Sequence, residues 1–414
     1  MLKNYIKIAF KVMLRNKLFT FISLFGICFT LLFLILLSSV IDYGFGPVKP
    51  ETKLARTLSI TMGSLSTESG GNTMGPLFSP WFFRKYVKPM TTPEKISISS
   101  YYNPDVIYRG DKKIKLGIKY TDAEFWDICD FNFLEGQPYN KEEVAATDQV
   151  AVINRRLQEL YFDGEPTAGK ILEYKDKRYL VKGVVDNVSI VRIMPYADIW
   201  VPMGHAEIEL DKPTLIGGFP GWYASLLAKD KHDIPAIKAE FQKRIENVEF
   251  PEGIYNKLLT SASSYQEALA RQMFRRQDGN IYPFMMILLG VATIFMLLPA
   301  INLVNINMSR IYERASEIGI RKAYGASSIV LTGQFLVENI IITLLGGILS
   351  VVMAAIILSI FNRSGILADT TFTINFRVFF VSMGFALFFG ILSGVYPAWK
   401  MSRLMPVQAL EGGE

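Results

Sequence analysis

Cysteine and histidine are scarce in this chain. Its 414 residues include 2 cysteines, Cys28 and Cys129, and 2 histidines, His205 and His232. A disulfide framework needs more cysteines than this, and zinc sites and His-based triads need more histidines and cysteines. We therefore expect no catalytic residue and no metal site. Each histidine is expected to be a single structural side chain, and Cys129 to be a buried thiol.

Charged residues are also fewer than usual, at 20% of the chain against about a quarter in average proteins. Hydrophobic residues make up 50%, which excludes a disordered chain. The formal net charge is +6, and a basic balance of this kind is typical of nucleic-acid-binding proteins. Where the positive charge lies along the chain decides whether that class applies.

Long runs without charge indicate a membrane protein. Residues 19–41 are 23 residues with no charged side chain, which is enough to cross a hydrocarbon core about 30 Å thick. Further apolar runs lie at 282–304, at 329–361 with a polar lead-in, and at 377–399. We therefore expect four transmembrane helices. A signal peptide is the alternative for the first run, but the run is too long and no Ala-x-Ala site follows it.

Lysine and arginine gather on one side of these spans. Residues 1–18, 305–328 and 400–414 together hold 11 Lys and Arg against 4 Glu, whereas the short loop 362–376 holds only Arg363. The positive-inside rule therefore predicts a multi-pass plasma-membrane protein (inner membrane in a Gram-negative cell) with both termini in the cytoplasm. The outer segment 42–281 holds 31 Lys and Arg against 32 Asp and Glu. The net positive charge thus reflects the membrane topology of the chain, and we expect no nucleic-acid partner.

The outer segment 42–281 is long enough to fold as an α+β domain. Strands are expected at 96–99, 113–118, 149–153, 178–185, 199–202 and 222–228, and helices at 154–162, at 234–248 after a capping Asp233, and at 262–277. The last helix is either a stalk toward the second span or an ordinary linker. The stretch 64–80 is rich in Gly, Ser and Thr, and we expect it to be a flexible entry.

One motif imitates a nucleotide-binding loop. Gly164-Glu-Pro-Thr-Ala-Gly-Lys170 fits the pattern G-x-x-x-x-G-K, but Ile171 stands where Ser or Thr would hold magnesium. The segment also follows a predicted helix rather than a strand, and it lies on the outer side, away from cytoplasmic ATP. We therefore expect no ATPase site and no bound cofactor in this chain.

The cytoplasmic loop 305–328 contains a short amphipathic pattern, with Ile311, Ala315 and Ile318 on one side at helical spacing. A helix here is too polar to span the membrane. It lies either on the membrane surface or in a groove of another protein.

Two runs carry a family resemblance, Arg314-Ala-Ser-Glu-Ile-Gly-Ile-Arg-Lys-Ala-Tyr-Gly-Ala326 in this loop and Tyr396-Pro-Ala-Trp-Lys-Met-Ser-Arg-Leu-Met-Pro-Val-Gln-Ala-Leu410 in the tail. Both resemble the FtsX/MacB-like permeases of ABC transporters. In the outer segment, Val150-Ala-Val-Ile-Asn154 and Val181-Lys-Gly-Val-Val-Asp186 are similar to the MacB-type periplasmic core domain. The chain differs from the fused exporters of that family because it lacks an ATPase domain.

The resemblance implies a permease dimer, of identical chains or of paralogues, bound to separate ATPase subunits that hold ATP and Mg. The loop helix would be the coupling helix that contacts the ATPase, through Glu313, Arg314, Glu317, Ile318, Gly319, Ile320, Arg321, Lys322, Ala323 and Gly325. ATP-driven movement would pass through the membrane to the outer domain (mechanotransmission), for export from the cell envelope. Some family members also work with a periplasmic adaptor or an outer-membrane duct.

Small residues recur four apart in the last two spans, at Gly346, Ser350 and Ala354 and at Gly390 and Gly394. This spacing allows helices to approach closely, either within one subunit or between subunits. Residues 1–18 combine an apolar side with lysines, which is typical of a helix that lies on anionic lipid.

Two other function classes stand beside export. An FtsX-like regulator would use the same scaffold to activate an envelope partner, such as a cell-wall hydrolase, and would move no cargo. A membrane-anchored enzyme would need a catalytic cluster within 42–281, and the sequence shows none.

Overall fold

The computed structural model describes residues 2–402 apart from 69–71, 76–77, 275–281, 284, 296, 298–300, 302–319, 321–326 and 367–368. The chain forms two compact units. The membrane unit comprises Met1–Asp42, Pro283–Ser364 and Thr371–Glu414, and the outer unit comprises Tyr43–Tyr282 with Gly365–Thr370.

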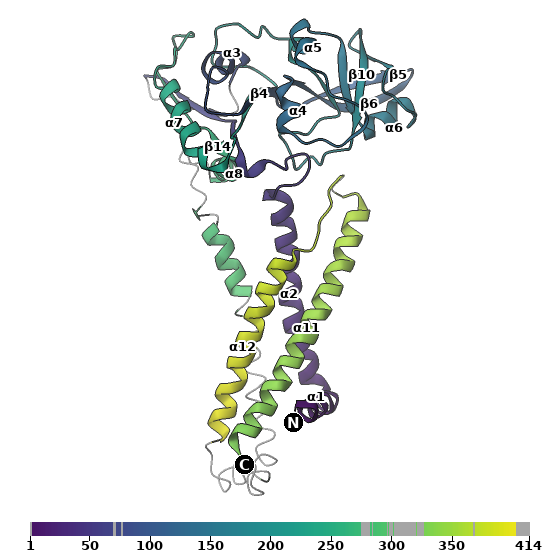
Figure 1. Ribbon diagram of the computed structural model, residues 1–414, viewed down its shortest axis with the longest axis vertical. Helices are drawn as coiled ribbons and strands as arrows, with labels where there is room; N and C mark the ends of the chain where they lie inside the picture. Colours follow the sequence, from purple (N-terminus) through teal and green to yellow (C-terminus); the bar gives the residue numbers. More distant parts are fainter. Residues whose placement is uncertain are drawn as a thin grey trace. The chain divides into compact units, whose positions relative to one another are not determined.

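Long apolar helices build the membrane unit (Figure 1). α2 (Lys17–Phe45) and the segment Leu336–Ser364 of α11 (Ser328–Ser364) are long and apolar enough to cross a bilayer. The apolar helix Met285–Phe295 and the apolar part of α12 (Phe376–Ser402) are shorter. The count of four spans therefore stays a prediction.

Helices α1, α2, α11 and α12 share one core. Ile27 and Ile35 of α2 are 2% and 0% exposed, and they pack with Ile342 of α11 and Phe379 of α12. On another side of α2, Phe21, Phe25 and Phe29 are more than half exposed and stack in a row. A helix that is apolar both inside and outside its bundle is typical of a lipid environment.

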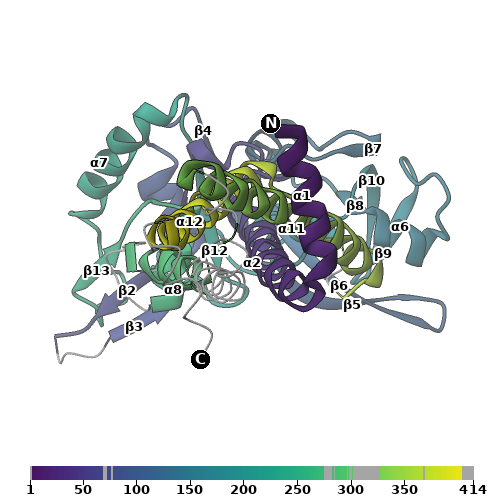
Figure 2. The same cartoon turned by 90° about the horizontal axis from the view of Figure 1, so that it is seen from below.

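The first helix lies across the second. α1 (Leu2–Arg15) runs across the direction of α2 (Figures 1 and 2), and the two helices are separated by Asn16. The hydroxyl of Thr20 donates to the carbonyl of Met13 at 3.1 Å at this bend. Met13 is buried in the core, while Phe10 and Leu14 are 46% and 70% exposed. α1 thus keeps an exposed apolar side of the kind that an interfacial helix presents to lipid.

One mixed sheet organises the outer unit. Among the described residues its strands follow the order β14-β1-β12-β4-β6-β11-β8-β10-β7, with β5 on β6 and β9 on β10. Their bounds are β1 Thr57–Ile60, β4 Lys95–Ser100, β5 Asn103–Arg109, β6 Lys112–Thr121, β7 Phe133–Gly136, β8 Val150–Asn154, β9 Ile171–Tyr174, β10 Lys177–Val185, β11 Ile199–Pro202, β12 Trp222–Leu227 and β14 Ser263–Ser264. A second sheet has the order β13-β2-β3, with β13 at Lys257–Thr260, β2 at Gly63–Ser66 and β3 at Asn72–Gly75.

The large sheet consists of two halves that meet between β4 and β6. The pairing of these two strands is confined to Ser99 and Thr121, whereas β6 pairs along most of its length with β5 and runs parallel to β11. We call β14-β1-β12-β4 the first half and the strands from β6 to β7 the second half. Short helices accompany both halves: η1 Leu54–Arg56, α3 Pro80–Phe82, η2 Phe83–Val87, α4 Glu124–Ile128, α5 Lys141–Ala146, α6 Arg155–Phe162, η3 Met203–His205, η4 Lys231–Asp233, α7 Ile234–Ile245 and α8 Tyr265–Phe274.

Most of the strands and helices expected in this unit are confirmed. The turn from β8 into α6 shows why the sequence predicts it, since the side chain of Asn154 accepts from the N–H of Leu157 at 2.9 Å and so caps the helix. Cys129 is buried, as expected.

Two local expectations are wrong. The stretch 64–80 is not simply a flexible entry, because β2 and β3 form within it and pair with each other. These strands consist largely of small or polar residues, so the sequence shows no hydrophobic alternation there. Asp233 does not cap α7; its carboxylate accepts instead from the N–H of Asp230, in a capping box around η4.

Phe82 tests the core of the first half. It is 0% exposed and stacks on Phe78 at 4.4 Å between ring centroids. We expect Phe82→Ala to lower the free energy of unfolding of the outer unit by about 3–5 kcal/mol, because it leaves a cavity. Phe219→Ala is the control, since Phe219 is 76% exposed. Urea unfolding of the purified full chain, followed by tryptophan fluorescence, measures both, and equal effects would contradict this account of the core.

Candidate functional site

The predicted coupling residues lie almost entirely outside the described residues. Ile320 is the exception: it is helical and 52% exposed. The others, which the structure does not describe, are Glu313, Arg314, Glu317, Ile318, Gly319, Arg321, Lys322, Ala323 and Gly325. Their contact with an ATPase stays a prediction.

The small residues predicted for helix packing lie on α11 and α12. A Cβ on Gly346 would come within 2.8 Å of the side chain of Ile27, so α11 approaches α2 closely at this point. Ser350 and Ala354 are 0% exposed. On α12, the carbonyl of Gly390 accepts from Asn339 Nδ2 at 3.4 Å, while the side-chain surroundings of position 394 are not described. A subunit interface at these helices stays a prediction.

A buried carboxylate closes the junction between the two halves of the outer sheet. Asp122 directly follows β6, and its side chain is 7% exposed. Its Oδ2 accepts from the N–H of Ile98 at 2.8 Å, and its Oδ1 accepts from Ser97 Oγ at 2.7 Å. Because both partners belong to β4, the carboxylate takes the place of ladder hydrogen bonds where strand pairing stops. Burial raises the pKa of Asp122 to about 6.

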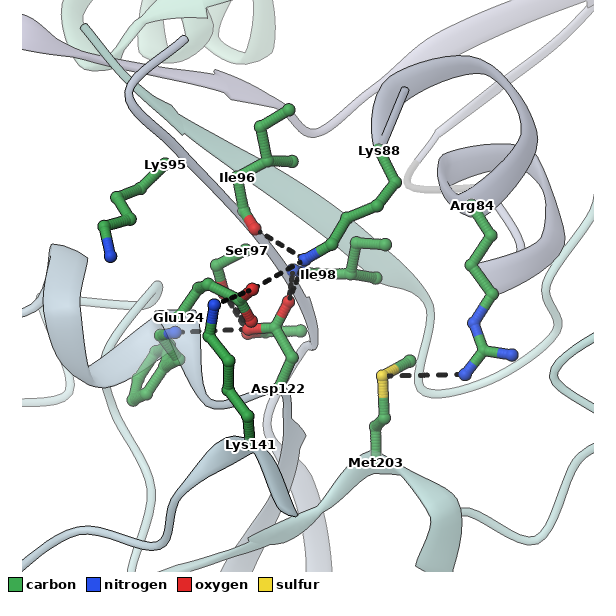
Figure 3. A network of polar contacts seen from close by, with 12 residues as sticks. Arg84, Lys88, Lys95, Ile96, Ser97, Ile98, Asp122, Glu124, Lys141 and Met203 are labelled. Carbon is green, nitrogen blue, oxygen red and sulfur yellow. Dashed lines mark hydrogen bonds and ion pairs between the residues drawn. The ribbon is translucent and has the colours of Figure 1, made fainter. Parts of the chain in front are cut away.

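Two lysines form ion pairs beside Asp122, approaching Asp122 and the neighbouring Glu124 from opposite sides (Figure 3). Lys88, next to η2, lies 3.4 Å from Asp122 and 3.3 Å from Glu124, and Lys141 of α5 lies 3.4 Å from Glu124. Burial alone would raise the pKa of Glu124, but the charges of Lys88 and Lys141 hold it below its usual range. The cluster therefore links Lys88, on the first half, to Glu124 of α4 and Lys141 of α5. Helix α4 lies at the junction, since it contacts β4 and also packs through Phe125 on the second half.

A pocket of about 370 Å³ opens beside this cluster. Arg84 and Lys88 line it from the first half, and Lys141, Val144 and Met203 line it from the second. Its lining is formed by side chains from both halves. A change in the angle between the halves would therefore change the pocket.

A second buried cluster ties the outer unit to the end of α2. Arg192 is 1% exposed, and its guanidinium lies 3.2 Å from the carboxylate of Glu51. The same group donates to the carbonyl of Tyr43 at 2.5 Å and to the carbonyl of Gly46 at 2.7 Å. Burial raises the pKa of Glu51, and the neighbouring Arg192 opposes that shift. One side chain from the loop before β11 thus holds the point at which the chain leaves α2.

The loop between α11 and α12 is tied to the same region. Asp369 accepts from Asn187 Nδ2 at 2.8 Å, and the hydroxyls of Thr370 and Ser189 lie 2.6 Å apart. The hydroxyl of Tyr43 donates to the carbonyl of Asp369 at 3.4 Å. Residues 187–192 therefore contact two chain segments that lie at the ends of different apolar helices.

Sequence reasoning did not identify Asp122, Arg192 or Asp369 as important. A signal for Arg192 was present, because it is the one charged residue in the otherwise apolar stretch Ile190-Val-Arg-Ile-Met194. A charge in such surroundings is often buried with a partner.

The glycine-rich loop after α6 is not a phosphate site. A helix precedes it and a strand follows it. The N–H groups of Thr167 and Ala168 donate to the carboxylate of Glu135 at 2.7 and 3.0 Å. Since a carboxylate of the chain occupies these amides, the loop serves to join α6, β9 and β7.

Comparison with known families accounts for both units. The family described as MacB-like periplasmic core domain matches residues 20–244, which is more than half of the chain. The family described as FtsX-like permease C-terminal matches residues 289–406. The chain belongs to the MacB-like permeases of ABC transporters. It is therefore a membrane-embedded permease with a large extracytoplasmic domain.

Individual relatives share the organisation at low identity. This permease is 24% identical to an uncharacterized ABC transporter permease, YvrN of Bacillus subtilis, over 98% of this chain and 99% of that one. It is 22% identical to the macrolide export ATP-binding/permease protein MacB of Haemophilus ducreyi over 97% of this chain, but it spans only 55% of that protein. Among solved structures, the extracellular domain of YknZ from Gram-positive bacteria is 12% identical and covers 49% of this chain and 98% of its own, with a TM-score of 0.37.

The junction carboxylate makes the stability of the permease depend on pH. The pKa of Asp122 rises from 3.8 in the unfolded chain to about 6 in the fold. The folded state therefore binds more protons between these values, and the stability that a protonated Asp122 contributes is lost as the pH rises through about 6. We expect the free energy of unfolding of the wild type, relative to Asp122→Asn, to fall by about 2.4 kcal/mol from about pH 4 to about pH 7. Asp211→Asn, at an 81% exposed side chain, is the control; a pH-independent difference at Asp122 would contradict this assignment.

The buried pair at the end of α2 should be sensitive to loss of one partner. Arg192→Met leaves Glu51 buried without its cation, so we expect a loss of about 3–5 kcal/mol in the free energy of unfolding. The double variant Arg192→Met/Glu51→Met should recover part of that loss. Lys85→Met breaks the exposed pair of Lys85 with Glu249, at side-chain exposures of 37% and 67%, and should lower the free energy of unfolding far less than Arg192→Met does. Urea unfolding of the full chain in detergent compares the three variants.

Proposed function

We propose that this permease works with a separate ATPase, as a dimer of permease chains, and passes ATP-driven movement of its membrane helices to the outer unit. The proposed task is export of a substrate from the cell envelope. Export is supported by the names of the MacB relatives, and a separate ATPase by the likeness to YvrN, an ABC transporter permease that this chain matches over 99% of its length.

One observation carries the mechanical part of the proposal. Arg192 and Asn187, from one loop of the outer unit, hold the chain at Tyr43 and at Asp369. These positions lie at the end of α2 and shortly after the end of α11. Relative movement of the two helices would therefore reach this loop through hydrogen bonds and an ion pair rather than through a slack linker.

The loop leads directly into the body of the outer unit. Residues after Arg192 continue into β11, which pairs with β6 and β8 in the second half. The first half joins β6 through the short β4 pairing and the Asp122 cluster. A displacement of the loop would thus act first on the second half and change its angle to the first. Such a change of angle would alter the shape of the pocket between the halves.

The cytoplasmic side of the proposal rests on the coupling residues in loop 305–328. They would receive the movement of the ATPase, and ATP and Mg would be bound by that partner. This chain's contribution is contact and transmission.

Paired substitutions in the loop test the coupling. We expect Glu317→Ala/Arg321→Ala to reduce ATP turnover several-fold in a membrane-reconstituted complex with the candidate ATPase, because the change removes charged contacts to that subunit. Arg363→Ala, in the last turn of α11, is the matched control and should leave turnover unchanged. If no complex with an ATPase can be isolated, or if the loop variant hydrolyses ATP at the control rate, the proposed function fails.

A further inference from the structure

The loop that carries Arg192 also exposes apolar side chains. Ile190 is 57% exposed and Ile193 is 49% exposed, while Arg192 between them is 1% exposed. Ile366, in the neighbouring segment between α11 and α12, is 69% exposed. A single exposed isoleucine is ordinary on a protein surface. Two that flank a side chain anchored at the end of an apolar helix are a more specific feature.

Covalent connection places this loop near the membrane surface. α2 has 29 residues, which at 1.5 Å per residue is about 44 Å, longer than a hydrocarbon core of about 30 Å. The last turn of α2 therefore lies at headgroup depth or just beyond it. Arg192 contacts the carbonyl of Tyr43, within that last turn, at 2.5 Å. Ile193 is the next residue along the chain, about 3.8 Å away between Cα atoms.

The segment between α11 and α12 also indicates that the loop lies near the membrane surface. Helix α11 ends at Ser364, and Ile366 lies two residues later. Thr370 of the same short segment meets Ser189, the residue before Ile190, at 2.6 Å between hydroxyl oxygens. Both contacts lie within the outer unit.

We propose that Ile190 and Ile193 contact the lipid of the outer leaflet, and that this loop is the membrane-surface contact of the outer unit. Exposed apolar side chains at such a depth are favoured at the boundary between headgroups and acyl chains. The buried Arg192 side chain holds the loop to the end of α2. The side chains of Ile190 and Ile193 on either side of it stay exposed on the surface of the outer unit. The contact would support the outer unit against the bilayer while the helices move. It goes beyond the proposed function, because it requires neither an ATPase nor a cargo.

Depth-dependent quenching tests the lipid contact. The full chain is placed in nanodiscs as Ile190→Cys or Ile193→Cys, each labelled with an environment-sensitive NBD fluorophore. The native Cys28 and Cys129 are both buried, and the unsubstituted chain measures their background labelling. Tyr108→Cys is the matched control, because Tyr108 is a large side chain, 61% exposed, on β5.

We expect a blue-shifted emission at positions 190 and 193 and strong quenching by lipids that carry a doxyl group near the headgroup. Neither effect is expected at position 108. Emission and quenching at 190 and 193 that equal those at 108 would overturn the proposal. It would also be overturned by a blue shift without lipid quenching that appears only with two chains per disc, because the loop would then be an interface between subunits. Loss of ATP turnover in the coupling variant has no bearing on this result, so the two proposals fail separately.

Discussion

The buried ion pair of Arg192 with Glu51 holds the start of the outer unit, where the chain leaves α2. A guanidinium buried to 1% exposure is costly unless every donor finds an acceptor. Here the acceptors are a carboxylate and two backbone carbonyls at and just after the end of α2. Carbonyls at the end of a helix lack partners within the helix and carry partial negative charge. The two terminal nitrogens of Arg192 meet these acceptors and hold the loop to the last turn of α2, while its buried Nε has no hydrogen-bond partner among the described residues.

The second constraint lies inside the outer unit, where a long sheet narrows to a short pairing between β4 and β6. Strand pairing is cooperative along a ladder, so a narrow junction is a natural place for movement between two otherwise well-packed halves. Asp122 holds this junction through the N–H of Ile98 and the hydroxyl of Ser97, and Lys88 with Glu124 adds charge across it. Such a junction resists separation, yet its few contacts permit a change of angle. In the proposed function, this junction and Arg192 lie on the path along which movement passes from the end of α2 to the pocket.

Local sequence signals predicted the elements of the outer unit well where side chains were large. β6, β10, β11 and β12 carry alternating or continuous apolar residues, and α6 begins at a capping Asn154. The signals failed where the side chains were small or the strands short. β2 and β3 are built from residues such as Gly63, Ser64 and Asn72, which carry no hydrophobic pattern; β2 pairs with β13 on one side and with β3 on the other.

The candidate sites likewise divide into those that local sequence predicts and those that it does not. The coupling loop and the small-residue spacing could be proposed from sequence because each is a local pattern. Asp122, Arg192 and Asp369 could not, because their partners lie 24, 141 and 182 residues away in the chain.

The sequence by itself determined that this is a membrane protein with a large outer domain and to which permease family it belongs, and it predicts on which side each basic segment lies. These properties depend on the length of apolar runs, on the distribution of Lys and Arg, and on local motifs. Only the tertiary structure decided which charges are buried, where the outer sheet narrows, and which loop of the outer unit contacts Tyr43 and Asp369. Those features depend on contacts between distant residues, since the energy of a buried charge is set by the partners that folding brings to it.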